Sequence, residues 1–143
     1  MTSTERRIIL KRDEIQIWLN FHILVEQKTA ALQIQDEAER DRQLIIAIDH
    51  GNEALHCDPD NRFVHVTAQI EAQIGHIYYR LLSEQDNKVY LMTTAQKHFR
   101  KMLHLAGKYG DCVENDLGEQ WFIEGKQQLD ELTVELERLT QEN

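Results

Sequence analysis

Proline occurs once in this chain of 143 residues, and glycine occurs six times. Turns between β-strands rely on both residues, so their scarcity argues against a strand-and-turn architecture. Gln, Glu, Leu, Ala and Ile are abundant instead. No Gly/Ser-rich or Pro-rich linker divides the chain, and its length fits a single domain. We therefore predict one all-α domain over residues 1–143.

The chain also lacks a long apolar run. The most apolar stretch, residues 15–25, is about half the ~20 residues that a membrane-crossing helix needs, and it contains Gln16, Asn20 and His22. The first residues lack the uninterrupted apolar core of a secretory signal. The two cysteines show no Cys-x-x-Cys spacing, which favours free thiols in a reducing compartment. We expect a cytoplasmic protein with no membrane partner.

Positive charge is scarce and unevenly placed. The net charge of −9 argues against a nucleic-acid partner, because phosphate neutralisation requires clustered Lys and Arg. Residues 87–110 hold five basic side chains and no acidic one, whereas residues 111–143 hold two basic and ten acidic side chains. Two neighbouring helices of complementary charge explain this pattern. A basic binding face on the first helix and an acidic one on the second is the alternative.

Hydrophobic periodicity predicts about five antiparallel helices. They cover about residues 4–34, 37–57, 62–82, 89–108 and 113–140. Asp36 and Glu39 have the spacing of a capping box at the start of the second helix. Residues 107–110 contain two glycines and predict the end of the fourth.

The first and last predicted helices carry the most distinctive apolar patterns. The apolar positions of the first helix form more than one stripe, so we expect neighbours on two of its sides. In the last helix, apolar and small residues alternate steps of three and four; they are Phe122, Gly125, Leu129, Leu132, Leu136 and Leu139. This spacing favours packing on the preceding hairpin, with self-association as the alternative.

Residues 47–61 form the most informative segment. Ala47, Gly51 and Ala54 recur on one helical face, where small side chains let a second helix approach closely. Pro59 then ends the helix, because proline disfavours the α conformation of the preceding residue. Asp60 and Asn61 are expected to cap the next helix, which should begin at residue 62 or 63.

This order of small residues and turn resembles the tetratricopeptide repeat (TPR), a pair of antiparallel helices that stacks on the next pair. Ala47, Gly51, Ala54 and Pro59 match a second helix and its turn; Gly75 and Tyr78 match a first helix, with Ala95 and Phe99 on its partner. Trp18, Phe21 and Val25 can be laid on an earlier first helix. The resemblance covers residues 17–106, although the helices are longer than in the standard repeat. It implies TPR-like stacked helical hairpins, with residues 113–140 as a C-terminal capping helix.

The resemblance also implies a binding surface. Carried over through Gly75 and Tyr78, the groove positions of a TPR first helix are Gln69, Ala72, His76, Tyr79 and Arg80. Tyrosine and arginine are favoured anchors in protein interfaces, and a boundary tyrosine beside a solvated arginine is the structural alternative. The implied function is a non-catalytic adaptor or assembly subunit that binds a protein, peptide or partner helix through Gln69, His76, Tyr79 and Arg80.

Two further functions remain open, as does self-association. One is a small TPR-like chaperone for a secreted or aggregation-prone client. The other is a metal-holding helical bundle. Because about three repeats are usually needed for a stable stack, the last helix, a homodimer or a bound partner should complete the core.

Signatures of catalysis and of metal binding are weak. His50, Glu53 and His56 form His-x-x-Glu-x-x-His, but the two histidines point roughly 240° apart on a helix. Cys57 and Cys112 have acidic neighbours in sequence, unlike the electropositive setting of a reactive thiol. The chain has neither a Gly-rich phosphate loop nor a Ser-centred elbow motif. We expect no enzymatic activity and no cofactor.

Overall fold

The computed structural model describes residues 1–83, 87–112 and 119–141, and for residues 108–112 it describes the backbone alone. This part of the chain is all-α and contains no strand, as predicted. Its helices are α1 (Ser3–Ala31), α2 (Glu37–His56), α3 (Val64–His76), α4 (Lys88–Cys112) and α5 (Gln120–Gln141). A π-helical segment, η1 (Ile77–Leu81), continues α3 without a break.

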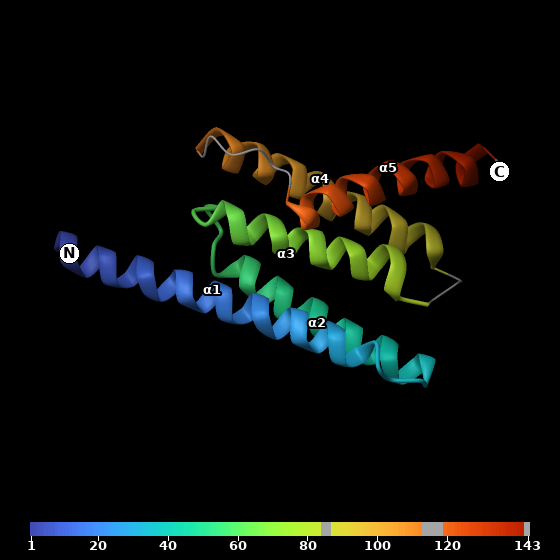
Figure 1. Cartoon of the computed structure of the whole chain (residues 1–143), viewed down its shortest axis with the longest axis horizontal. Coiled ribbons are helices and arrows are strands. Elements are labelled where there is room, and N and C mark those ends of the chain that lie inside the picture. The colour runs from blue at the N-terminus through green and yellow to red at the C-terminus, as the bar shows by residue number, and fades with distance from the viewer. Residues whose placement is uncertain (84–86, 113–118, 142–143) are drawn as a thin grey trace.

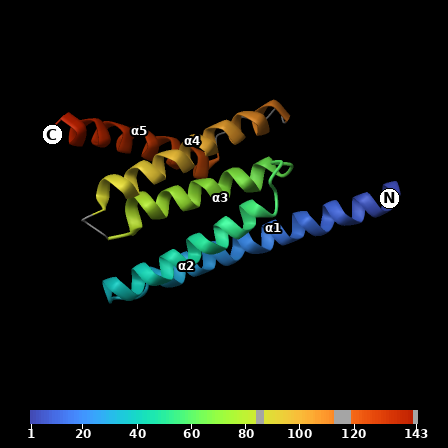
Figure 2. The ribbon, with the colours of Figure 1, turned by 180° about the vertical axis from the view of Figure 1, so that it is seen from behind.

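Successive helices run in opposite directions along the length of the molecule (Figure 1). The α1–α2 pair forms one side, and α3 lies between this pair and α4, a relation that the view from behind also shows (Figure 2). α5 packs on α4 and reaches α3 as well. α3 is therefore the central helix, in contact with all four others.

Side chains at the helix starts explain where the first two helices begin. The Thr2 hydroxyl accepts a hydrogen bond from the Glu5 amide at 3.1 Å, and the Glu5 carboxylate accepts one from the Thr2 amide, which completes a capping box. The Asp36 carboxylate accepts a hydrogen bond from the Glu39 amide at 2.9 Å, as the sequence predicted. Each bond satisfies a backbone donor that the helix itself leaves unpaired.

The small-residue faces lie inside the protein and set the helix spacing. Ala47 and Ala54 are fully buried. A methyl group placed on Gly51 would lie 2.9 Å from Cδ1 of Ile74, so α2 and α3 touch closely at this point. Gly75 has the same role between α3 and α4, where a methyl group would lie 3.0 Å from the ring of Phe99. The small residues therefore lie at contacts between helices, as predicted, and the atoms that face the two glycines belong to side chains of the neighbouring helices.

Two groups of buried side chains form the core. The first joins α1, α2 and α3 through residues such as Ile17, Leu24, Leu44, Ile70 and Ile74. The second joins α3, α4 and α5 through Phe99, Met102, Leu129 and Leu132. Full burial of one such side chain contributes about 1.5–3 kcal/mol. The apolar seam of α5 therefore packs on the preceding helices, as predicted.

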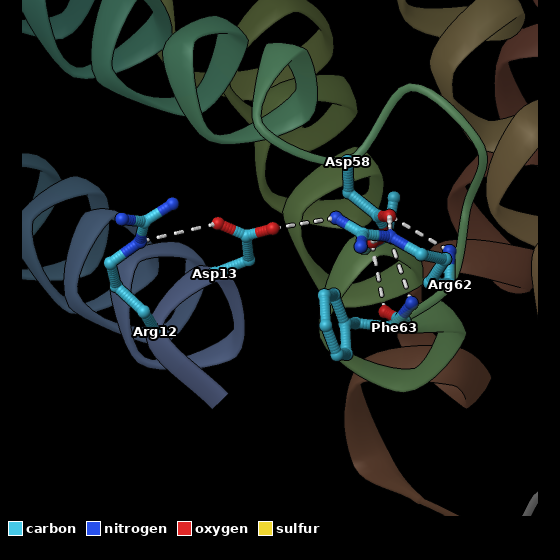
Figure 3. A network of polar contacts seen from close by, with 6 residues as sticks. Arg12, Asp13, Asp58, Arg62 and Phe63 are labelled. Atoms are coloured by element: carbon cyan, nitrogen blue, oxygen red, sulfur yellow. Dashed lines mark hydrogen bonds and ion pairs between the residues drawn. The ribbon is translucent and has the colours of Figure 1, made fainter. Parts of the chain in front are cut away.

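No side chain caps the start of α3, and a different residue from the ones expected holds the turn that leads into it. The buried carboxylate of Asp58 accepts hydrogen bonds from the backbone amides of Arg62 at 2.8 Å and Phe63 at 2.9 Å (Figure 3). The capping role predicted for Asp60 and Asn61 is wrong, because Asn61 takes a left-handed conformation (φ 54°) that turns the chain back toward Asp58.

The same network ties the turn between the hairpins to α1. The Arg62 guanidinium contacts Asp58 and reaches Asp13 of α1, with Nη2 3.1 Å from Oδ2 (Figure 3). Asp13 in turn lies beside Arg12. The turn after α2 is therefore held from both the α3 side and the α1 side.

One predicted boundary needs correction, and a second lies outside the described residues. The fourth helix does not end at residues 107–110, because α4 remains helical to Cys112 and no described glycine has a positive φ. The predicted start of the last helix at Val113 lies outside the described residues; within them α5 begins at Gln120. The π-helical turn of η1 was not predicted.

The second apolar stripe of α1 has no neighbour within the described chain. Ile8, Ile15 and Leu19 lie on the opposite side of the helix from the buried Ile17 and Leu24, and they are 64%, 57% and 51% exposed. Among the described residues, the expectation that α1 has neighbours on two opposite sides is therefore not met. α2 and α3 cover the other side of α1.

Candidate functional site

A polar groove lies where α1, α3 and α5 meet. Its volume is about 170 Å³. The lining residues are Lys28 of α1, Ala72, Gln73 and His76 of α3, and Trp121, Glu124, Gly125 and Gln128 of α5. Because three helices supply the walls, the groove exists only when α5 packs across α3.

Hydrogen bonds across the groove connect α3 to both neighbours. The Lys28 ammonium donates to the side-chain oxygen of Gln73, which joins α1 to α3. His76 Nδ1 donates to the side-chain oxygen of Gln128 at 2.8 Å, which joins α3 to α5. Since an amide oxygen only accepts, His76 carries its proton on Nδ1 and leaves Nε2 as an acceptor.

Burial shifts the two titratable groups that line the centre of the groove. It lowers the pKa of the Lys28 ammonium, and the negative charge of Glu124 partly opposes this effect. It also lowers the pKa of His76; the hydrogen bond that His76 donates to Gln128 opposes this effect, and the positive charge of Lys28 adds to it. The lowered pKa favours the neutral imidazole at pH 7, in which the Nδ1 proton is bonded to Gln128 and Nε2 is left as an acceptor.

A row of aromatic rings extends the groove toward the start of α3. The ring of His65 lies between those of Trp18 and Trp121, with centroid distances of 6.2 and 6.0 Å. Glu119 accepts a hydrogen bond from the Trp121 indole at 2.6 Å and lies 3.0 Å from His65 Nε2. The side-chain nitrogen of Gln69 lies 3.3 Å from the same His65 atom. His65, Gln69 and His76 therefore follow one face of α3, with Trp18 on the α1 side and Trp121 on the α5 side.

The structure places Tyr79 and Arg80 in a second cavity. This cavity has a volume of about 470 Å³ and is lined by residues of η1, α4 and α5. The Arg80 guanidinium lies 4.3 Å from the ring centroid of Tyr79 and forms an ion pair with Glu131 of α5. Burial raises the pKa of Tyr79, and the charge of Arg80 opposes the increase.

The four residues predicted to bind a partner are thus divided between two sites. Gln69 and His76 belong to the groove and its aromatic row, whereas Tyr79 and Arg80 do not line the groove. The division falls where α3 passes into η1, whose i→i+5 hydrogen bonding departs from the α-helical period. The 3.6-residue period of α3 therefore does not predict the directions of side chains after His76.

A comparison with protein-family models found no match for this chain. Searches among curated proteins and solved structures found none either.

Several groove residues were missed by sequence reasoning. They are Lys28, Gln73, Trp121 and Gln128. Gln73 had a usable signal, since it lies four residues after Gln69 and three before His76 on the same helical face. The others come from α1 and α5, which lie far from α3 in sequence.

The structure also bears on the membrane, metal-binding and cysteine patterns considered in the sequence. No described helix is long and apolar enough to cross a membrane. Within the part of the chain that the structure describes, no group of three or more His, Cys, Asp or Glu side chains is arranged to hold a metal ion. Cys57 is a half-buried free thiol.

Proposed function

We propose that this protein is a non-catalytic, TPR-like module that binds a peptide or partner helix in the groove of α1, α3 and α5. The observation that carries this proposal is the row of Trp18, His65 and Trp121, one ring from each of the three helices, which continues into the groove. In the TPR resemblance α1 and α3 are the first helices of successive hairpins, and α5 is the capping helix. α5 would then serve both as the cap and as a wall of the binding surface.

The chemistry of this surface suits an extended polypeptide better than a small molecule. A volume of about 170 Å³ is below the range of about 300–1,000 Å³ typical of small-molecule sites. Gln69, Gln73 and His76 supply donors and acceptors at regular steps along α3, which matches the repeating N–H and C=O groups of a peptide. Trp18 and Trp121 supply half-buried aromatic area, the kind that most often anchors protein interfaces.

Tyr79 and Arg80 would extend the contact toward the second cavity. Arg80 is already paired with Glu131, so a partner reaching this site competes with α5 for the guanidinium. The groove residues therefore have the larger part in this proposal. The adaptor role and a cytoplasmic setting belong to the same proposal.

The test is an affinity purification from the native cell with two double variants. One is Gln69→Ala/His76→Ala in the groove, and the other is Tyr79→Ala/Arg80→Ala in the second cavity. Lys126→Ala on the exposed surface of α5 is the matched control, and circular dichroism checks helicity in each variant.

The groove proposal expects that co-purifying chains are lost with the first double variant and retained with the control. Loss with the second variant alone would move the binding site to the second cavity. Unchanged recovery with both folded variants would remove the binding assignment.

A further inference from the structure

A third cavity lies on a different face of the protein, between α2, the turn after it, α3 and α4. Its volume is about 470 Å³. Its lining residues are Asn52, Leu55, His56, Pro59, Glu71, Lys97, His98 and Lys101. It shares no residue with the groove, which uses α1 and α5 where this cavity uses α2 and α4.

A buried carboxylate forms the floor of this cavity. Glu71 is only 1% exposed, and its Oε2 lies 2.6 Å from Nδ1 of His98. Its Oε1 lies 3.6 Å from the ammonium of Lys101. A buried charge destabilises a protein unless it is paired and hydrogen-bonded. In Glu71, Oε2 is hydrogen-bonded to His98 and Oε1 is ion-paired with Lys101, and both partners come from α4.

Glu71 thereby fixes two groups that line the cavity. Because a carboxylate only accepts, His98 donates from Nδ1, so its Nε2 is the ring nitrogen left for another partner. The ring of Tyr78 stacks on the imidazole of His98 at 5.8 Å with an interplanar angle of 8°. The imidazole and the Lys101 ammonium are therefore held in place before any ligand arrives.

The lining is positive in a strongly acidic protein. Its two lysines and one glutamate give a formal charge of +1 with histidine neutral, against −9 for the chain. Lys97 and Lys101 are both exposed on α4, within the segment 87–110 that has no acidic residue. Leu55 and Pro59 supply an apolar wall, and Asn52 adds an amide.

We propose that this cavity binds a small organic anion, in which a carboxylate or phosphate group is attached to a compact apolar body. Lys97 and Lys101 contact the anionic oxygens, and Leu55, Pro59 and the ring of His98 contact the apolar body. The volume lies within the range of small-molecule sites. Prior positioning by Glu71 reduces the entropy that binding must overcome. The site is additional to the groove and does not depend on the function proposed for it.

The test is a titration of the ¹⁵N-labelled full chain followed by NMR. The ligands are benzoate and phenyl phosphate, which separate a carboxylate from a phosphate, with benzamide as the neutral analogue. We expect saturable shifts of the Asn52, His56, Lys97 and His98 amides with one or both anions and none with benzamide. A titration with inorganic phosphate shows whether the apolar body contributes to binding. We expect inorganic phosphate to bind more weakly than phenyl phosphate, because it lacks that body.

Two charge variants locate the site. Lys97→Gln should weaken binding at least about fivefold, whereas Lys126→Gln, which removes the same charge from exposed α5, should change it less than about twofold. Absence of saturable shifts with both anions, an equal response to benzamide, or equal weakening by the two variants would overturn the proposal. Since Lys97 is exposed, its replacement is expected to preserve the fold.

The outcome is separable from that of the groove. Gln69→Ala/His76→Ala, designed to disrupt the groove, should bind these anions as the unmodified chain does. A failure of anion binding therefore does not bear on the proposal for the groove. Likewise, a failure of partner binding in the groove does not bear on the anion site.

Discussion

Gly75 of α3 lies against the ring of Phe99 of α4, so closely that a methyl group on Gly75 would be 3.0 Å from Cε1 and Cζ of the ring. Phe99 is fully buried and has little room to move. We expect Gly75→Ala to reduce the free energy of unfolding by about 1–2 kcal/mol, even after the gain in helix propensity. Urea denaturation followed by circular dichroism measures the change.

Gly107 provides the matched control. It also lies in a helix, but a methyl group there would meet nothing within 4 Å. Gly107→Ala should therefore raise the free energy of unfolding by up to about 1 kcal/mol through helix propensity. A loss of stability at Gly107 would show that α4 ends there after all. Equal effects at the two glycines would contradict the close contact at Phe99.

The contacts at the small residues of α2 and α3 were predictable because their determinants are local. Ala47, Gly51 and Ala54 are spaced along one helix, and only small side chains allow the backbone contact that this spacing implies. Gly75 was identified in the same way. Hydrophobic periodicity predicted the all-α class and most of the helices, and Pro59 predicted the end of the second helix.

The groove was only partly predictable because it depends on long-range packing. Trp121 and Gln128 reach it only because Gly125 lets α5 approach Met102 of α4 closely. Periodicity assigns an apolar face to α5 but does not say which polar residues will face α3. The π-helical turn that separates His76 from Tyr79 is likewise invisible to a 3.6-residue pattern.

Asp58 and Asp60 offer a direct test of how the hairpins are joined. Asp58 is buried and accepts bonds from two backbone amides, from Arg62 and from the Thr67 hydroxyl, so Asp58→Ala leaves several donors unsatisfied. We expect a loss of about 2–3 kcal/mol in the free energy of unfolding. Asp60 is exposed, and Asp60→Ala should stay within about 0.5 kcal/mol. A larger effect at Asp60 would restore the cap predicted from the sequence.

His76 makes stability depend on pH in a predictable direction. Burial lowers its pKa in the folded protein, with Lys28 and Arg80 adding to the effect and Gln128 and Glu124 opposing it. Below the ordinary value of 6.5, the unfolded chain therefore binds a proton that the folded one does not, so stability falls as pH decreases. Unfolding between pH 7.5 and 5.5 should show a shallower pH slope in His76→Gln.

The pKa of His76 can also be measured directly by NMR titration of its imidazole. It should lie below 6.5, and Lys28→Met should raise it by removing a nearby positive charge. A pKa above 6.5, or one that Lys28→Met lowers, would contradict the placement of His76 between α1 and α5.

The two histidines of α4 should differ sharply although they lie only six residues apart. His98 donates to the buried carboxylate of Glu71, so His98→Ala leaves that charge without one of its two partners. The expected loss is about 1–3 kcal/mol in the free energy of unfolding. His104 is exposed, and His104→Ala should change stability by less than about 0.5 kcal/mol. If the double variant Glu71→Leu/His98→Ala were no more stable than His98→Ala alone, the unpaired carboxylate would not be the cause of the loss.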